Sequence, residues 1–398
     1  MAQDSSNSNS TITTVQGQQH APSDLATLRS RIDSLDESLV ALLNERASIS
    51  VNIGLAKQKA ATVGGLPADD HIHRPSREKQ IYDRLETLNH GPLPTPAIQS
   101  IFREVMSASI SLQRTTTIAF LGPRGTYTHQ VAYARFGDSV QYVAQGTIDE
   151  VFDAVESRRV TYGVVPFENS KFGSVVQTLD RFCAGASAPS VQIRAEHYLA
   201  VSHALLVNRG TGKSQIKRVY SHPQAFGQCQ AYIARNLRGV EQVNVASTAR
   251  AAELAAGEEG AAAICSSACA GLFGLEVADE AIEDAKDNTT RFFIIGDTSD
   301  SPSADDRTLV SFTVDHRQAG ALCDALAVLK EHGINLTKID SRPSGQRPWH
   351  FFFFIEMTGH MATADVASAI EGLKAHCLDV RVLGSYPSQR PKADNGGL

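Results

Sequence analysis

The chain has no apolar run that approaches the roughly 20 residues needed to cross a bilayer as a helix. It also has no long basic stripe, and its net charge of -6 and pI near 6.1 argue against a nucleic-acid or membrane surface as partner. The 6 cysteines lack the C-x-x-C pairs of a zinc site. We therefore expect reduced thiols, a cytoplasmic protein, and anionic ligands that a few placed cations bind.

The first 23 residues are rich in Ser, Thr, Gln and Asn, and no Lys or Arg precedes Arg29. They lack the charged start and apolar centre of a secretory signal and the Arg content of a transit peptide, so residues 1–23 are predicted to be a disordered tail. The 398 residues exceed what one hydrophobic core usually serves. We expect three domains, at residues 24–114, 116–300 and 307–390.

A long helix is predicted after Asp24, because apolar residues recur at steps of three and four from Leu28 to Ile53. About 35 residues of helix would be some 50 Å long, so a partner helix from a second chain is expected. Arg46 interrupts the apolar stripe, and Lys57 lies within about 20° of the same face. A cation there is costly unless it is paired or binds an anion. Arg29 is about 25 Å away along the helix and can share that site only from a second copy; the alternative is three snorkelling surface cations.

Two further helices are predicted before residue 114. RPSREKQIYDRLETL carries Arg77 and Glu78 early in the second helix. IQSIFREVMSASISLQ ends with Ser109 and Gln113 one turn apart on one face of the third. Inward Arg, Lys, Glu and Gln would suit a small dianion whose reaction needs positioning and charge stabilisation rather than a nucleophile.

The segments LRSRIDSLDESLVALLNERASISVNIGLAK, RPSRE and SASISLQ resemble the three helices of the all-helical chorismate mutases. The resemblance implies an all-α three-helix domain, an intertwined dimer, and conversion of chorismate to prephenate. It assigns the catalytic site to seven residues, the first from the partner chain: Arg29, Arg46, Lys57, Arg77, Glu78, Ser109 and Gln113. Two departures concern substrate affinity, namely Arg74 at a position that is acidic in some members and the long loop from Gln58 to Ser76.

Strands and helices alternate from Ile118 to Gly296, which favours a parallel-rich α/β domain, and the late return of the chain indicates two lobes with a cleft between them. The Gly-rich turn GPRGTYTHQ would present backbone N–H groups and Thr126 to an anion, although it lacks the spacing and Lys of a P-loop. Polar residues at strand ends can converge on the cleft, although each alone is more often a cap or turn residue. These residues are Asn169, Ser221, Gln228 and Thr290, and Ser174 opens another predicted helix.

The stretch DNTTRFFIIG (287–296) runs from polar side chains into an apolar strand. It would place hydroxyls and a cation where open α/β sheets bind ligands, and the alternative is a solvated turn before a strand.

GPRGTYT, PFENSKFGSV, SHPQAFGQC and TTRF, in that order, resemble prephenate dehydratase, which implies a two-lobed domain like the type II periplasmic-binding folds. The resemblance gives Thr290 the central role, as proton or hydrogen-bond donor to the leaving hydroxyl. A Thr hydroxyl is a poor acid at pH 7, so Glu168 or His222 could supply the proton. Arg291 could fix a carboxylate or be structural. The expected substrate-binding residues are Thr126, Asn169, Ser174, Ser221, Gln228 and Arg291. Arg124 and Tyr127 depart from the Glu and Phe of the family's GPEGTF motif.

After Arg307 the predicted order is β-α-β-β-α-β, an α+β ferredoxin-like unit. GAL (320–322) and DSRP (340–343) resemble the ACT regulatory domain of dehydratases, where they border an amino-acid site at a subunit interface, and Asp340 replaces the usual Glu. The resemblance implies feedback inhibition by L-phenylalanine through a two-state equilibrium. The expected effector residues are Gly320, Ala321, Leu322, Asn335, Leu336, Ser341, Arg342 and Pro343.

The sequence thus predicts a bifunctional enzyme of phenylalanine biosynthesis, a homodimer or higher homo-oligomer that turns chorismate into prephenate and prephenate into phenylpyruvate, CO2 and water. One alternative is a non-catalytic metabolite sensor, which would have no reason to keep seven mutase positions. Another is an arogenate dehydratase, because the residues that choose the ring substituent are not legible. No cofactor is expected, and no metal either, because the H-x-H of His71 and His73 in a loop is usually incidental.

Overall fold

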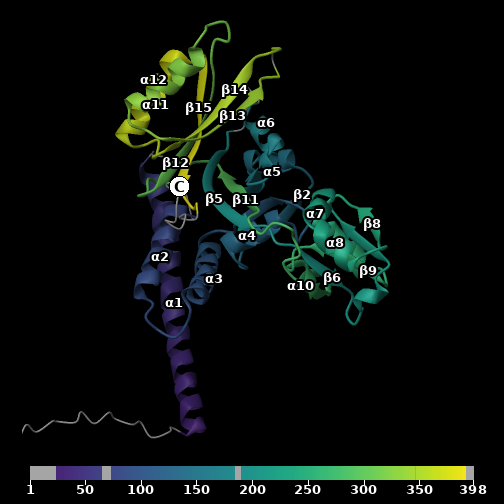
Figure 1. Cartoon of the computed structure of the whole chain (residues 1–398). Helices are drawn as coiled ribbons and strands as arrows, with labels where there is room; N and C mark the ends of the chain where they lie inside the picture. Colours follow the sequence, from purple (N-terminus) through teal and green to yellow (C-terminus); the bar gives the residue numbers. More distant parts are fainter. Residues whose placement is uncertain (1–23, 65–72, 184–189, 346, 391–398) are drawn as a thin grey trace, which may run out of the picture. The chain divides into compact units, whose positions relative to one another are not determined.

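A computed structural model gives the fold and describes residues 24–64, 73–183, 190–345 and 347–390 (Figure 1). The chain divides into two compact units, Met1–Ile49 and Ser50–Leu398, and each is described by itself. The tail predicted at residues 1–23 and His71 of the H-x-H lie outside the described residues. Among the helices of the described ranges, none is long and apolar enough to cross a membrane.

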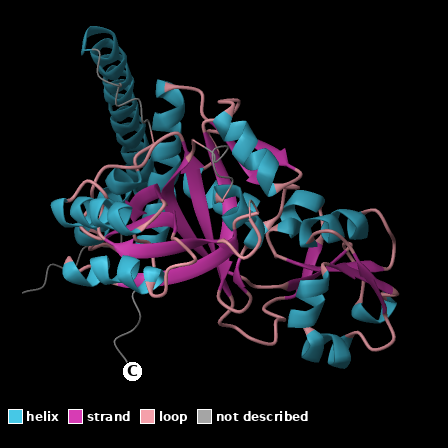
Figure 2. Cartoon of the chain, turned by 90° about the horizontal axis from the view of Figure 1, so that it is seen from above, coloured by secondary structure: helices cyan, strands magenta, loops and turns pink. Residues whose placement is uncertain are grey.

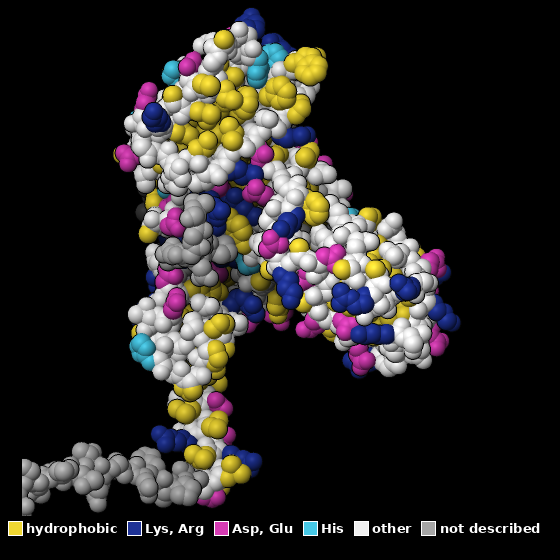
Figure 3. Space-filling view, viewed as in Figure 1, with side chains coloured by type: hydrophobic (Ala, Val, Ile, Leu, Met, Phe, Trp, Pro, Cys, Tyr) yellow, Lys and Arg dark blue, Asp and Glu magenta, His cyan; other side chains and the backbone are white. Residues whose placement is uncertain are grey.

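Helix α1, Leu25–Gly64, begins in the first unit and ends in the second. Its predicted apolar stripe is present, and in the first unit these side chains are between 44% and 63% exposed (Figure 3, yellow along the helix). They are Leu28, Ile32, Leu35, Leu39 and Leu42. Exposed large apolar side chains at this spacing confirm the apolar stripe predicted for the helix.

Helices α2, Pro75–Leu88, and α3, Thr95–Gln113, follow in the second unit. Each has a proline in its first turn, where the missing N–H would be unpaired in any helix. Gly54 of α1 lies against α3: a Cβ at this position would come within 3.2 Å of the Gln113 side chain, so the absence of a side chain lets the two elements approach closely.

The first α/β lobe is built on a sheet with the strand order β2-β1-β3-β11-β5. Figure 2 shows the strands of the chain in magenta and the helices in cyan. Its strands are β1 Thr117–Leu121, β2 Gln141–Gln145, β3 Tyr162–Asn169, β5 Gln192–Ala200 and β11 Thr289–Gly296, and the short β4 Gly173–Ser174 pairs with β3. Its helices are α4 Tyr127–Phe136, α5 Ile148–Glu156 and α6 Val176–Phe182. β1 is parallel to β2 and β3, whereas β11 is antiparallel to β3 and β5. The prediction of a parallel-rich sheet is therefore only half right, because β11 returns from the second lobe and inserts in the opposite direction.

The second lobe has the strand order β10-β6-β9-β7-β8 and is also mixed. Its strands are β6 Ala204–Val207, β7 Arg218–Ser221, β8 Glu241–Asn244, β9 Ala261–Cys265 and β10 Glu276–Asp279. Its helices are η2 Lys213–Gln215, α7 Pro223–Gln228, α8 Gln230–Asn236, α9 Thr248–Ala256 and α10 Cys269–Phe273. Two short helices follow Ser221 and meet at Cys229, so Gln228 ends α7 and does not lie at a strand end as expected.

The C-terminal part has the predicted β-α-β-β-α-β order and a fully antiparallel sheet, β13-β14-β12-β15. Its elements are β12 Asp306–Thr313, α11 Ala321–Glu331, β13 Leu336–Pro343, β14 Phe351–Thr358, α12 Ala364–His376 and β15 Asp379–Pro387. The α+β ferredoxin-like expectation is confirmed.

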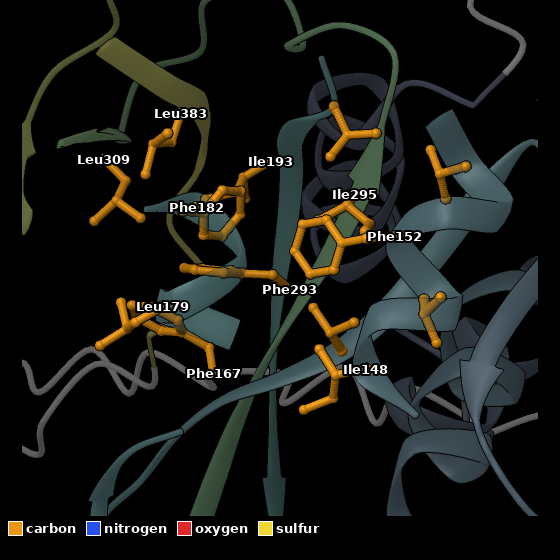
Figure 4. Packing of buried hydrophobic residues seen from close by; sticks show 14 of the residues in the cluster. Ile148, Phe152, Phe167, Leu179, Phe182, Ile193, Phe293, Ile295, Leu309 and Leu383 are labelled. Atoms are coloured by element: carbon orange, nitrogen blue, oxygen red, sulfur yellow. The ribbon is translucent and has the colours of Figure 1, made fainter. Parts of the chain in front are cut away.

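The two faces of this C-terminal sheet have different partners. Ile355 and Met357 of β14 belong to a core with α11 and α12, while Phe352 and Phe354, which alternate with them, belong to a core shared with the first lobe. In that shared core Leu309 and Leu383 lie close to Phe293 of β11 (Figure 4). The strand that begins at Thr289 is thus packed against the C-terminal sheet.

Candidate functional site

A cavity of about 570 Å³ lies between the two α/β lobes. Three residues that cap helices line it: Thr126 before α4, His222 before α7 and Ser247 before α9. Ser247 Oγ accepts a hydrogen bond from Arg250 N at 3.1 Å, and Thr126 Oγ1 accepts one from His129 N at 3.3 Å. Helix N-termini carry partial positive charge, so their convergence suits an anionic ligand.

Thr290 lies in this cavity at the start of β11, beside Asn169 at the end of β3. Asn169 Nδ2 donates to Thr290 Oγ1 at 2.9 Å and to Asn288 Oδ1 at 2.7 Å, while Asn169 Oδ1 accepts from the backbone N–H groups of residues 171 and 172. Both ends of the Asn169 amide are therefore occupied, which fixes its orientation. The Thr290 oxygen accepts, and its own hydrogen is available to a ligand.

The hydrogen-bonded chain continues from Asn288 to the other lobe. Asn288 Nδ2 donates to Gln228 Oε1 at 3.2 Å, the same oxygen lies 2.7 Å from His203 Nε2, and His203 Nδ1 lies 3.1 Å from the Tyr127 hydroxyl. Burial lowers the pKa of His203, which keeps the ring neutral. Nε2 then carries the proton that Gln228 Oε1 requires, and the unprotonated Nδ1 accepts a hydrogen bond from the Tyr127 hydroxyl.

The structure brings most of the predicted dehydratase residues together. Those that line the cavity are Thr126, Asn169, Ser174, Gln228 and Thr290. Ser221 does not line it: this side chain is fully buried, and its hydroxyl donates to Ile264 O at 2.6 Å within the second lobe. A hydroxyl that is already bonded in the core cannot serve a ligand in the cleft.

Arg291 follows Thr290 but faces the opposite side of β11, because successive side chains of a strand alternate. Its guanidinium contacts Glu196 and Glu356, with Nε 2.7 Å from Glu196 Oε2, and it lines a separate cavity of about 250 Å³. The burial that would lower the pKa of Arg291 is outweighed by the charges around it, which raise that pKa well above its ordinary value. Arg291 is thus held by protein carboxylates at a distance from the cleft where a substrate carboxylate was expected.

The two candidate proton donors are also separated. Glu168 lies on the Arg291 side of the sheet, where Oε1 is 2.7 Å from Lys338 Nζ, whereas His222 lines the cleft. His222 Nδ1 accepts from Gln224 N at 3.2 Å, so the proton of the neutral ring is on Nε2. Burial lowers the pKa of His222.

Asn288 lies in the predicted stretch 287–296, whereas three other cavity residues escaped the sequence-based prediction: His203, Ser247 and Thr248. The ST pair before an Ala-rich helix is a helix-start pattern and could have identified Ser247 as a cap. For His203, which lies between two apolar strands, the sequence carries no comparable pattern.

The predicted mutase residues lie in both units. Arg29 and Arg46 belong to the first, where burial lowers the pKa of the half-buried Arg46. In the second, Gln113 packs against Gly54, one turn before Lys57 in α1, and its Nε2 donates to Ser109 O at 3.3 Å. Of these residues, Gln113 is the one that the structure places against α1.

Arg77 and Glu78 are directed apart. Arg77 is exposed and donates to Gln80 Oε1 at 3.1 Å. Glu78 is buried, with Oε2 3.0 Å from Arg135 Nη2 of α4 and 3.1 Å from His73 Nε2. Although burial acts in the opposite direction, the Arg135 charge and the His73 hydrogen bond lower the pKa of Glu78. In this structure Glu78 is a buried ion-pair partner of the α/β lobe and is not grouped with Arg77.

Three family models match the chain in succession: Chorismate mutase type II at residues 28–114, Prephenate dehydratase at 118–300 and ACT domain at 308–375. The chain is 39% identical to the bifunctional chorismate mutase/prephenate dehydratase of Aquifex aeolicus (strain VF5), over 92% of this chain and 98% of that protein. The protein of the same name from Neisseria gonorrhoeae (strain ATCC 700825 / FA 1090) is also 39% identical, over 90% of this chain and 96% of that protein. This chain belongs to the family of bifunctional chorismate mutase/prephenate dehydratases.

Solved structures resemble the dehydratase and ACT part of this enzyme. Prephenate dehydratase from Arthrobacter aurescens, in complex with L-Phe, is 31% identical with a TM-score of 0.62, over 69% of this chain and 90% of that one. A protein described as GqqA, a novel type of quorum quenching acylase, is 29% identical with a TM-score of 0.62, over 69% of this chain and 98% of that one. Mutase, dehydratase and ACT domains are thus all present in this bifunctional enzyme.

The residues expected to bind the effector lie at the start of α11 and along β13 of the ACT domain. Gly320 precedes α11 with a φ of 84°, in the left-handed region that favours glycine, and Ala321 and Leu322 begin the helix. Asn335 and Leu336 lie at the start of β13, and Ser341, Arg342 and Pro343 at its end. Arg342 Nε and Nη2 lie 2.6 and 3.0 Å from the two oxygens of Asp180 in α6. In the described ranges no group of three or more His, Cys, Asp or Glu side chains could hold a metal ion.

Proposed function

We propose that this enzyme converts chorismate to prephenate in its helical domain and prephenate to phenylpyruvate in the cleft of its dehydratase domain, under control by L-phenylalanine. The family membership and the order of its three domains support the two reactions. The hydrogen bond of 2.9 Å from Asn169 to the Thr290 oxygen carries the assignment of the dehydratase site.

Thr290 acts as a hydrogen-bond donor to the hydroxyl that leaves C4 of prephenate. Because Asn169 donates to its oxygen, the Thr290 hydrogen is directed to the ligand, and the Asn169 bond makes the hydroxyl a stronger donor through cooperativity. The C1–carboxylate bond breaks as CO2 leaves, and its electron pair enters the ring. The C4–O bond breaks with its pair on oxygen, which takes a proton and leaves as water. The neutral ring of His222 lines the cleft and can donate a hydrogen bond from Nε2 to the departing hydroxide, which then takes its proton from water, whereas Glu168 lies on the other side of the sheet.

The carboxylates of prephenate are bound by neutral donors and helix N-termini. Among the described residues that line the cleft there is no Lys, Arg, Asp or Glu. The N-termini of α4 and α9 supply backbone N–H groups there. Because no fixed cation among the described cleft residues pairs with the C1 carboxylate, no ion pair has to break when this carboxylate loses its charge and leaves as CO2. This favours decarboxylation.

The test replaces the Thr290 hydroxyl without changing its shape. Thr290→Val should lower dehydratase turnover about 100-fold or more, since loss of a positioned proton or hydrogen-bond donor has effects of this size. Thr290→Ser is the matched control and should retain most of the turnover. Phenylpyruvate formation from prephenate measures both. Equal rates for the wild-type and Val enzymes would show that the site lies elsewhere.

In the mutase domain, Arg46, Lys57, Arg77 and Arg29 from a second chain bind the carboxylates and ether oxygen of chorismate during its rearrangement. The exposed apolar stripe of α1 supports a dimer in which the first helices of two chains pair. Arg46→Ala should lower mutase turnover about 100-fold while the dehydratase turnover survives. Arg31→Ala, an exposed arginine of the same helix, is the control. Loss of both activities in the Arg46 variant would contradict separate sites.

Control by L-phenylalanine is supported by the ACT domain and by the related dehydratase whose structure was determined in complex with L-Phe. Added L-phenylalanine should slow phenylpyruvate formation by this enzyme. The measurement uses chorismate as substrate and follows its loss together with product formation, with and without the amino acid. No response, or a response to tyrosine alone, would refute this form of regulation.

A further inference from the structure

At the ends of β3 and β11, which carry the proposed dehydratase site, side chains line a different cavity on each face of the sheet. Thr290 of β11 is the cross-strand partner of Asn169 in β3, and Arg291 is the partner of Glu168. The first pair lines the cleft, and the second lines the separate cavity on the other side of the sheet. Whatever holds Arg291 and Glu168 therefore also sets the backbone positions of Thr290 and Asn169.

The Arg291 side is held by the ACT domain. The Arg291 guanidinium contacts Glu356 of β14, whose carboxylate also accepts from the Tyr386 hydroxyl at 2.8 Å and from Arg307 Nη1 at 2.9 Å. Burial alone would raise the pKa of Glu356, but Arg291, with the Tyr386 hydrogen bond and Arg307, lowers it to about 2. Glu356 is thus an anion with a complete set of partners, and it fixes Arg291 from the domain next to the catalytic lobe.

The Glu168 side is held by β13, the strand that ends in the DSRP motif. Lys338 Nζ lies 2.7 Å from Glu168 Oε1 and 2.9 Å from Asp340 Oδ2. Asp340 Oδ2 in turn accepts from the hydroxyl of Ser174 at 2.6 Å, and Ser174 lines the cleft. Both of these β13 side chains therefore contact the dehydratase lobe at or beside a cleft residue.

We propose that Glu356 and Lys338 of the ACT domain are positioning residues of the dehydratase reaction, which hold Arg291 and Glu168 and thereby align Thr290 with Asn169. The inference rests on the proposed role of Thr290. It makes the ACT domain a part of the dehydratase site in addition to a receptor for an effector. A shift of β13 or β14 then changes the geometry of the Thr290 hydroxyl directly, because an ion pair joins each of these ACT strands to a residue next to the cleft.

Lys338→Met in the full-length enzyme tests the inference. It should lower the dehydratase kcat about tenfold and change KM by less than about twofold, because the variant displaces a catalytic hydroxyl without removing a ligand contact. Lys338→Arg, which keeps the charge, should restore most of kcat. Lys374→Met is the matched control, since it removes an exposed ACT ion pair with Glu371 and should leave kcat unchanged.

Circular dichroism and thermal unfolding of the same samples report whether each variant is folded. If Lys338→Met does not fold, Glu356→Gln, which keeps the shape of the side chain, is judged by the same fall in kcat. A wild-type kcat in a folded Lys338→Met or Glu356→Gln enzyme would overturn the inference. The Thr290→Val enzyme separates the two proposals: full activity there refutes the assigned cleft, whereas an inactive Thr290→Val beside a fully active Lys338→Met refutes only the positioning role.

Discussion

Arg135→Met should destabilise the enzyme strongly, because it leaves the Glu78 carboxylate buried without its counter-ion. The Arg135 and Glu78 side chains are 4% and 9% exposed, and Nη2 lies 3.0 Å from Oε2. Two unit charges at that distance interact by about 5 kcal/mol at an effective dielectric constant near 20. Removal of one partner of a buried pair typically costs about 3–5 kcal/mol. We expect a loss of that size in the free energy of unfolding, measured by urea titration and circular dichroism.

The loss should depend on pH because His73 shares the same carboxylate, with Nε2 3.1 Å from Glu78 Oε2. Burial, together with the Arg135 charge, lowers the pKa of His73 in the folded enzyme. The pKa of His73 is about 6.5 in the unfolded chain and lower in the folded enzyme. The contribution of His73 to the free energy of unfolding is therefore fully present above about pH 6.5, and it is lost as the pH falls through the pKa of the folded state. Without Arg135 the pKa of His73 rises, and protonated His73 becomes the counter-ion of Glu78. The effect of Arg135→Met should therefore be smaller near pH 6 than near pH 8.

Two further variants make this prediction specific. Arg250→Met removes an exposed arginine paired with Glu253 and should change the stability by less than about 0.5 kcal/mol. A double variant, Arg135→Met with Glu78→Met, removes both charges and should recover much of the loss. A change below about 1 kcal/mol for Arg135→Met, or a loss that is equal at both pH values, would refute the reasoning.

Three other outcomes follow from the geometry. Gly384→Ala should destabilise the ACT domain by several kcal/mol, because a Cβ at this position would lie 2.2 Å from Ile193 O and because the backbone has a φ of 152°. Thermal unfolding measures the loss of stability, and a loss under about 1 kcal/mol would contradict this prediction. Asn169→Asp, whose carboxylate cannot donate to Thr290, should lower the dehydratase kcat about 30-fold or more, and an unchanged kcat would exclude this hydrogen bond from catalysis. Leu39→Glu in the exposed stripe of α1 should abolish dimers in sedimentation experiments and lower mutase turnover, whereas an intact dimer would place the interface elsewhere.

The helices and strands of the fold could be predicted from local sequence patterns. The direction of each strand depends on its pairing with strands that are distant in the sequence. Apolar periodicity located α1 and the alternating strands of both lobes. It could not show that β11 inserts antiparallel between β3 and β5, because strand direction depends on where the chain returns from the second lobe. The break at Cys229 follows Gly227, which favours an interruption of the helix. The hydrogen bond from Asp284 N to Gln228 O, which joins residues 56 positions apart, accompanies the break and has no local sequence pattern.

The sequence predicted the site residues correctly where a strand-end residue points into the cleft. It predicted them wrongly where the side chain points to the other face of the strand. Thr290 and Asn169 were expected at strand ends, and the structure places them in one cavity. Adjacent strand residues point to opposite faces, so Arg291 could not line the cleft beside Thr290, and this rule was available from the sequence. Ser221 fits the same strand-end pattern, and only tertiary structure shows that Ile264 O accepts its hydrogen bond.

The helix Tyr127–Phe136 contacts the dehydratase cleft at its start and a residue of the mutase domain near its end. Its start, at Thr126, lines the dehydratase cleft, and Arg135 near its end neutralises Glu78, a residue of the mutase sequence signature. Cutting the gene between residues 114 and 118 would leave one fragment with an orphaned anion and the other with an orphaned cation. In such fragments water would reach both side chains and solvate each charge, so the link between the dehydratase helix and the mutase signature depends on the two domains sharing one chain.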